Sequence, residues 1–163
     1  MIARSAAAGM RTVLRPARPD DFEFCADLYF AGTDEIIRKL SLDRAAQVAG
    51  FKQRWDVSQV RIITLEGAKI GWVQTANKDD ALFLAQLFVD GAFQRRGIGG
   101  EVVEHLIGEA TQAGQAMTLG VVKTNPALRL YRHAGFREVG RRPGYYAQPA
   151  GAATSALVLR RDL

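Results

Sequence analysis

Gln94-Arg95-Arg96-Gly97-Ile98-Gly99-Gly100 separates an apolar run from an amphipathic helix, and this order decides the fold. The run before it, residues 81–89, reads Ala-Leu-Phe-Leu-Ala-Gln-Leu-Phe-Val and predicts a strand buried on both faces. After it, apolar residues recur at helical spacing: Ile98, Val102, Val103, Leu106, Ile107 and Ala110. A strand, a glycine-rich turn and a helix direct backbone N–H groups at one point, which favours a phosphate or pyrophosphate.

Spacing excludes two common phosphate-binding loops. A Walker A loop has Gly-Lys-Ser/Thr after its second glycine, and no lysine follows Gly97, Gly99 or Gly100. The dinucleotide fingerprint G-x-G-x-x-G would place its third glycine at Val102. The remaining pattern, Gln/Arg-x-x-Gly-x-Gly/Ala, resembles the loop with which the GNAT family of N-acetyltransferases holds the pyrophosphate of acetyl-coenzyme A (acetyl-CoA). The alternative is a turn that only starts a helix.

A second segment, residues 122–136, resembles a later motif of the same family. It reads Val-Lys-Thr-Asn-Pro-Ala-Leu-Arg-Leu-Tyr-Arg-His-Ala-Gly-Phe. We expect Asn125 to cap a short helix that begins at Pro126, and Gly135 to end it in the left-handed conformation. Tyr131 would place its hydroxyl at the end of an apolar stripe, and the alternative is a core tyrosine whose hydroxyl has found a partner. The two motifs occur in the order and separation of the family.

The remaining pattern predicts further elements on both sides of these motifs. Turn signals occur at Glu66-Gly67 and at residues 77–80, and Gly32-Thr33-Asp34-Glu35 is expected to interrupt the first helix. We expect strands at 12–15, 60–65, 69–75, 81–89, 117–122, 136–140 and 155–161, helices from 19, 41, 98 and 126, and a loop at 143–153. The resemblance implies an α/β (α+β) fold, with a mixed, mostly antiparallel central sheet of six to seven strands flanked by about four helices.

Length and composition are those of one soluble domain. The 163 residues are 48% hydrophobic and 24% charged, and no apolar run approaches the ~20 residues that cross a bilayer. Residues 1–10 lack the apolar core of a signal peptide and are interpreted as a short disordered leader, with residues 11–163 as a single acetyltransferase domain. The single Cys25 excludes an internal disulfide, fits a reducing cytoplasm and is expected in the core.

Charge and histidine content indicate which partners to expect. The net charge of +5 is dispersed apart from three arginine pairs, and no recognised nucleic-acid module is present, which argues against a nucleic-acid partner. A polyphosphate cofactor suffices to explain the pair Arg95-Arg96. Two histidines, His105 and His133, without a cysteine or acidic cluster to complete a ligand set make no metal site, so none is expected. The resemblance leaves a homodimer open.

The GNAT resemblance implies transfer of an acetyl group from acetyl-CoA to a primary amine, by direct attack of the neutral amine within a ternary complex. That reaction needs a proton acceptor, donors for the developing oxyanion and an acid for the departing thiolate. The resemblance makes Tyr131 the acid and places Asn125 beside the cofactor arm. It assigns the pantetheine to backbone groups of Leu87, Phe88 and Val89, where two parallel strands splay apart, and the pyrophosphate to Gln94, Arg95, Arg96, Gly97, Ile98, Gly99 and Gly100.

The general base is the position at which the sequence departs from many relatives. Gln86 stands on the strand before the loop and cannot accept a proton usefully, and the strand before Asn125 carries no acid. Asp34 and Glu35 are candidates for the base or for acceptor binding, since the loop between the first two helices lines the acceptor side in the family. The alternatives are ordinary acids at a helix N-terminus and a base relayed by water.

The tail bears on the acceptor. Arg142-Pro143-Gly144-Tyr145-Tyr146, followed by an apolar strand, is similar to the tail of ribosomal-protein N-terminal acetyltransferases. Tyr145, Tyr146 and Gln86 are therefore candidate acceptor contacts. Gly120 stands where that subfamily has its catalytic Glu, so the acceptor remains either a peptide N-terminus or a small-molecule amine. A catalytically silent acyl-CoA-binding or interaction module is the alternative class.

Overall fold

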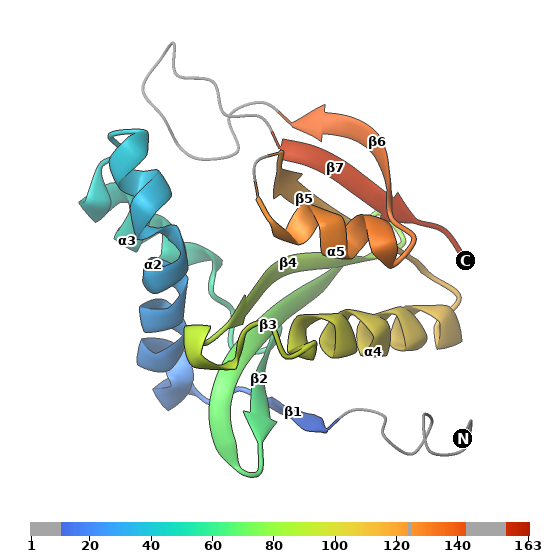
Figure 1. Cartoon of the computed structure of the whole chain (residues 1–163), viewed down its shortest axis with the longest axis horizontal. Helices are drawn as coiled ribbons and strands as arrows, with labels where there is room; N and C mark the ends of the chain where they lie inside the picture. The colour runs from blue at the N-terminus through green and yellow to red at the C-terminus, as the bar shows by residue number, and fades with distance from the viewer. Residues whose placement is uncertain (1–10, 124, 143–155) are drawn as a thin grey trace.

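The computed structural model of the chain describes residues 11–123, 125–142 and 156–163 (Figure 1). The described residues form seven strands, four α-helices and two short 3-10 turns. In chain order these are β1 (Thr12–Pro16), η1 (Pro19–Asp21), α2 (Phe22–Lys39), α3 (Arg44–Arg54), β2 (Val60–Leu65), β3 (Ala68–Lys78), β4 (Ala81–Val89), η2 (Gly91–Phe93), α4 (Ile98–Gln112), β5 (Ala116–Val122), α5 (Ala127–His133), β6 (Arg137–Arg142) and β7 (Ala156–Arg161).

The strands form one mixed sheet in the order β1-β2-β3-β4-β5-β7-β6. Every neighbouring pair is antiparallel except β4 and β5, which run parallel because α4 carries the chain back across the sheet between them. The expected mostly antiparallel sheet with about four helices is confirmed.

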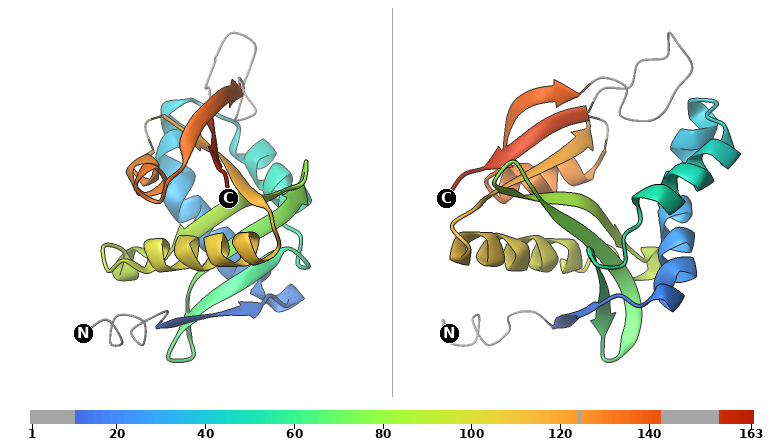
Figure 2. Two further views of the ribbon diagram at one scale, coloured as in Figure 1. Left: turned by 90° about the vertical axis from the view of Figure 1, so that its right-hand side faces the viewer. Right: turned by 180° about the vertical axis from the view of Figure 1, so that it is seen from behind.

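Two hydrophobic clusters lie on the two faces of the sheet. The first cluster, called the α4 cluster here, joins α4 and α5 to the strands, and it contains Ile63 of β2. The second, the α2 cluster, joins α2 and α3 to the other face, and it contains the neighbouring Ile62. Because successive side chains of a strand point to opposite faces, these two adjacent isoleucines separate the two cores. In Figure 1, α4 and α5 lie in front of the strands, and Figure 2 shows the sheet from behind.

The expected interruption of the first helix at residues 32–35 is wrong, since α2 continues through it. A Cβ on Gly32 would lie 3.1 Å from Cε1 of Phe88, so this glycine allows the helix to approach β4 closely. The hydroxyl of Thr33 donates to the carbonyl of Tyr29 at 2.8 Å, within the helix. Both residues thus serve packing and local hydrogen bonding in a helix, although their types favour a turn in isolation.

The two hairpins are built on turns with positive φ. Glu66 and Gly67 have φ of 51° and 84°, which confirms the predicted turn between β2 and β3. The next turn consists of Asp79 and Asp80, with φ of 52° and 61°, so β3 extends three residues beyond its expected end. The strand expected from residue 136 begins one residue later, at Arg137, and the expected start of the last strand at residue 155 lies outside the described residues.

Cys25 is fully buried in the α2 cluster, as predicted, and its burial raises the pKa of the thiol to about 11. Trp72 is also fully buried there and is a core residue. Of the described helices, none is long and apolar enough to cross a membrane.

Candidate active site

The two parallel strands diverge halfway along their length. Ala81 to Leu84 of β4 pair with Ala116 to Leu119 of β5, and the pairing stops there. Beyond this point β4 continues beside β3 to Val89, while β5 continues beside β7 to Val122. The sheet therefore opens between the carboxyl ends of two parallel strands, where α/β proteins commonly bind ligands.

A β-bulge at Ala85 accounts for this divergence. Gln74 of β3 pairs with Gln86, and the next residue, Thr75, pairs with Leu84, which leaves Ala85 without an opposite residue. A bulge bends the strand and increases its twist, and this one follows the last β4–β5 pair directly. The apolar run gives no sign of the bulge, because alanine is unremarkable at that position.

The bulge also decides which face each predicted pantetheine residue occupies. Leu87 and Val89 pack against the α4 cluster, whereas Phe88 packs against the α2 cluster. Phe88 stacks on Trp72 at 5.5 Å between ring centroids and meets the ring edge of Tyr29 at 5.4 Å. By strand alternation Gln86 lies on the same face as Phe88.

The expectation that β4 is buried on both faces is wrong. Only Ala81 and Leu84 are buried, and the other residues of the strand are half-buried. The unbroken half-burial from Ala85 to Val89 coincides with the divergence, since β5 no longer covers the edge of β4 there.

The predicted phosphate loop joins this open edge to the N-terminus of α4. Gly97 is the N-cap of α4, with φ of 80°, and no side chain caps the helix. The first N–H groups of a helix have no intrahelical acceptor, so an uncapped start leaves them available to an anion. A Cβ on Gly97 would meet nothing within 4 Å, so an approaching ligand is not obstructed by protein atoms there.

Contacts on both sides hold the loop in shape. The side-chain amide of Gln94 donates to the carbonyl of Val89 at 2.8 Å, which ties the loop to the end of β4. The guanidinium of Arg96 lies over the ring of Phe93, 5.3 Å from its centroid. Arg95 takes a φ of 64°, an uncommon value for a residue with a side chain. These contacts fix the shape of the loop at residues 94–97, which is called the cradle below.

Gly99 and Gly100 bring α4 close to α5. A Cβ on either glycine would lie 3.6 or 3.5 Å from a methyl group of Leu130, which is ordinary van der Waals contact. The cradle and α5 are therefore neighbours in space, although about thirty residues separate them in sequence.

Asn125 caps α5 as predicted. Its side-chain oxygen accepts from the backbone N–H of Ala127 at 2.9 Å, and its carbonyl accepts from Leu128 at 3.0 Å. Pro126 already has helical angles, so helical geometry begins there although α5 is counted from Ala127. Gly135 ends the segment with φ of 99°, as expected.

Tyr131 lies on the face of the sheet that carries the α4 cluster. It is 8% exposed and belongs to the α4 cluster, with its ring edge-on to Phe136 at 5.9 Å. Leu87 and Val89 pack against the same cluster, so the fold brings the predicted acid and the open end of β4 to one side of the sheet.

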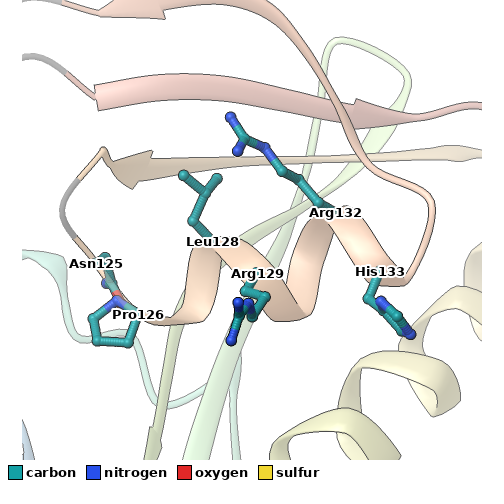
Figure 3. A pocket seen from close by; sticks show the side chains of 6 residues that line it. All are labelled: Asn125, Pro126, Leu128, Arg129, Arg132 and His133. Atoms are coloured by element: carbon teal, nitrogen blue, oxygen red, sulfur yellow. The ribbon is translucent and has the colours of Figure 1, made fainter.

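An open pocket runs along the outer surface of α5, beginning at Asn125 (Figure 3). Figure 3 shows Arg129 and His133 directed to one side of the helix and Arg132 to the other. Its lining residues are Asn125, Pro126, Leu128, Arg129, Arg132 and His133. Neither arginine forms an ion pair with any described residue, so both keep their charge available. Sequence reasoning missed these two arginines, because isolated basic residues on a short helix carry no pattern.

The two candidate carboxylates lie within α2 rather than in a loop, which corrects their expected position. Asp34 forms an ion pair with Arg44, and Glu35 forms one with Lys39 at 3.0 Å. Glu35 is exposed and Asp34 is half-buried, and the hydrogen bond from Lys39 lowers the pKa of Glu35. Tyr145 and Tyr146 lie outside the described residues.

In the part of the chain that the structure describes, no group of three or more histidine, cysteine or acidic residues could hold a metal ion. The groups described above are a helix N-terminus, arginines, an amide and a tyrosine.

Comparison with known proteins agrees with this geometry. The model of the acetyltransferase (GNAT) domain matches residues 56–138, about half of the chain. The [ribosomal protein bS18]-alanine N-acetyltransferase of Escherichia coli is 34% identical over 91 residues, which cover 55% of this chain and 62% of that protein. The match thus spans less than two thirds of the relative's length.

Solved structures share the fold across nearly the whole chain. A putative phosphinothricin N-acetyltransferase has a TM-score of 0.68 at 20% identity, covering 93% of this chain and 98% of that one. A GNAT family acetyltransferase from Elizabethkingia anophelis with acetyl-CoA bound has a TM-score of 0.64 at 18% identity, covering 94% and 99%. With the matched domain covering half of its residues, the chain belongs to the acetyltransferase (GNAT) domain family.

Proposed function

We propose that the protein is an N-acetyltransferase that transfers an acetyl group from acetyl-CoA to a primary amine. The observation that carries the proposal is the combination of the β4–β5 divergence with the uncapped, Gly97-started N-terminus of α4. A cofactor with a pyrophosphate and a thin arm that carries amide groups fits this combination. The pyrophosphate would lie at the helix N-terminus, and the arm would fill the opening between the strands.

The residues divide into those that hold the cofactor and one that handles a proton. Residues 94–100 would bind the pyrophosphate through backbone N–H groups, and backbone groups of residues 87–89 would bind the pantetheine. The amide of Asn125 lies at the adjoining start of α5, and Arg129 and Arg132 supply charge suited to the remaining phosphate. Tyr131 would donate its phenolic proton to the departing thiolate. It belongs to the α4 cluster, against which Leu87 and Val89 pack, and these two residues lie where the pantetheine is proposed to bind.

For the proton of the attacking amine we propose a water relay rather than a single carboxylate. Asp34 and Glu35 remain the carboxylate candidates, and both are engaged in ion pairs on α2. The lowered pKa of Glu35 makes it a weaker base. Gln86 lies on the same face of β4 as Phe88, where the acceptor would approach, and its amide could position an amine or a water by hydrogen bonding.

For the acceptor, a peptide N-terminus is favoured over a small-molecule amine on one observation. The curated relative with 34% identity is named for the alanine N-terminus of a ribosomal protein. Gly120 replaces the subfamily's catalytic Glu, and this departure keeps small-molecule amines in the test.

The test measures thiol release from acetyl-CoA against panels of primary amines and of peptides with different N-terminal residues. Binding of CoA is followed in parallel by calorimetry and by thermal shift, since a ligand that binds the folded state raises the unfolding temperature. We expect binding and turnover with at least one panel member. Binding without turnover on any acceptor would support the silent acyl-CoA-binding module, and absence of binding at saturating CoA would refute both.

A further inference from the structure

A residue far from the cofactor loop in sequence touches it in the structure. Nη2 of Arg11 donates to the carbonyl of Arg96 at 3.4 Å, across 85 residues of sequence. Nε of the same side chain lies 3.5 Å from Oε1 of Glu101, in the first turn of α4. The guanidinium therefore bridges the cradle and the first turn of α4.

Glu101 makes this bridge electrostatically significant. Its carboxylate is in the first turn of α4, where a negative charge stabilises the helix but repels an anion bound at the same N-terminus. Its Oε2 is buried and has no hydrogen-bond partner among the described residues. Within that part of the chain, Arg11 is the cation that pairs with Glu101.

We propose that Arg11 is a positioning residue for the cofactor loop. It neutralises Glu101 beside the cradle, and its bond to the Arg96 carbonyl helps to orient the loop so that its N–H groups face the pyrophosphate. This rests on the proposed binding of CoA and extends it to a residue outside the loop. Arg11 need not touch the cofactor, because it acts through Glu101 and the loop backbone.

The experiment is a binding cycle measured by calorimetry with CoA and with dephospho-CoA, which keeps the pyrophosphate but lacks the 3′-phosphate. The proteins are the wild type, Arg11→Ala, Arg11→Lys, Glu101→Gln and the double variant Arg11→Ala/Glu101→Gln. Arg137→Ala is the matched control, since Arg137 is an exposed arginine paired with Asp162 at 2.9 Å. Thermal unfolding without ligand is recorded for every variant.

We expect Arg11→Ala to weaken binding of both ligands about fivefold at low salt, the scale of a partly exposed charge pair. Arg11→Lys should recover most of the affinity, and the double variant should bind within about twofold of the wild type, because the uncompensated carboxylate is gone. The loss should shrink at high salt, and Arg137→Ala should bind like the wild type.

Three results would overturn the inference while leaving the proposed function intact. The first is unchanged binding by Arg11→Ala when the wild type binds CoA. The second is a loss seen with CoA but not with dephospho-CoA, which would mean direct contact with the 3′-phosphate. The third is an equal loss in Arg11→Ala and the double variant, which would show no coupling through Glu101. If the wild type binds neither ligand, the proposed function itself fails.

Discussion

The two faces of the sheet are covered by different kinds of side chain. The α4 side is mainly aliphatic, and it ends in a helix start without a side-chain cap, with Arg95 and Arg96 before it and open space at Gly97. The α2 side is an aromatic core in which rings meet edge-on, tilted or stacked: Tyr29, Phe30, Phe51, Trp72 and Phe88. The contrast supports the proposal that the first face binds an anion, and the aromatic packing of the second fixes the position of β4.

One buried carboxylate on the α2 side and two arginines on the α4 side differ in how their charges are paired. The buried carboxylate of the α2 side, Asp21, is satisfied by Arg15 at 2.9 and 3.1 Å, by Lys69 at 3.3 Å and by a backbone N–H at 2.8 Å. On the α4 side, by contrast, Arg129 and Arg132 have no acidic partner among the described residues. Paired charge favours structure, and unpaired positive charge favours an anionic ligand.

The largest effect is expected at the cradle itself. Gly97→Asp places a carboxylate where the pyrophosphate is proposed to bind, so affinity for CoA should fall by about two orders of magnitude or more. Gly67→Asp is the matched control, because Gly67 also has a positive φ, of 84°, and open space around it, but it lies in the β2–β3 turn. Calorimetry with CoA measures both. Equal binding of CoA by the two variants would show that the pyrophosphate does not bind at Gly97.

Tyr131→Phe should lower kcat about a hundredfold and leave the affinity for CoA unchanged, because only the proton donor is removed. Tyr29→Phe is the control on the α2 side: it is another buried tyrosine, whose hydroxyl accepts from Arg54 at 3.4 Å. Steady-state kinetics with any acceptor that turns over measures both. A kcat for Tyr131→Phe within threefold of the wild type would show that the thiolate receives its proton elsewhere.

Asp21→Asn should destabilise the fold by about 3 kcal/mol without changing CoA affinity, since it breaks a buried ion pair on the α2 side. The hydrogen bond from Arg15 holds the pKa of Asp21 well below its usual range. A depressed folded-state pKa contributes stability that is present above the unfolded pKa of about 4 and is lost as pH falls toward the folded value. Urea unfolding at several pH values should therefore show a steeper acid loss for the wild type than for Asp21→Asn. Asp27→Asn, at an exposed position of α2, should follow the wild type.

The same substitution, glycine to alanine, made on α4 and on α2 compares the two faces of the sheet directly. Gly108→Ala on α4 should stabilise by about 0.5–1 kcal/mol, because the added methyl meets open space and alanine favours the helix. Gly32→Ala on α2 should not gain this, because Phe88 lies 3.1 Å from the new Cβ and is held by Trp72 and Tyr29. Thermal unfolding measures the difference. A gain in stability at both glycines would mean that the side chains around Gly32 accommodate an added methyl group as readily as the open space at Gly108.

The smallest effect is expected for Asp34→Asn and Glu35→Gln. Each should change kcat/KM by less than twofold and leave the pH–rate profile in place, because each carboxylate is engaged in an ion pair on α2. If either variant shifts the acid limb of the pH–rate profile, the substituted carboxylate acts as the general base, and the proposed water relay is wrong.

The sequence alone predicted the parts whose signals are local. Residues 94–100 and 122–136 each contain the glycine, cap or turn residue that their backbone requires, so the loop, the two helices and the left-handed Gly135 could be read directly. The two hairpins were predictable for the same reason, since their turns fall at residues that tolerate positive φ.

Gly32, Ala85 and Arg11 show what sequence reasoning could not reach. Gly32 looks like a helix breaker, but it is needed because Phe88, 56 residues later in the chain, lies against it. Ala85 carries no bulge signal, because the bulge is defined by its pairing with β3. Arg11 contacts the loop at residue 96 only because the fold brings the residue before β1 beside α4.

The sequence by itself determined the family, the order of the elements and the glycine-rich loop at residues 94–100, because helix starts, turns and caps depend on neighbouring residues. The tertiary structure decided which residues share a face at the β4–β5 opening, that α2 is continuous, and that Asp34 and Glu35 are paired on its surface. Those features depend on contacts between distant segments, and a distant contact leaves no mark in the residues on either side of it.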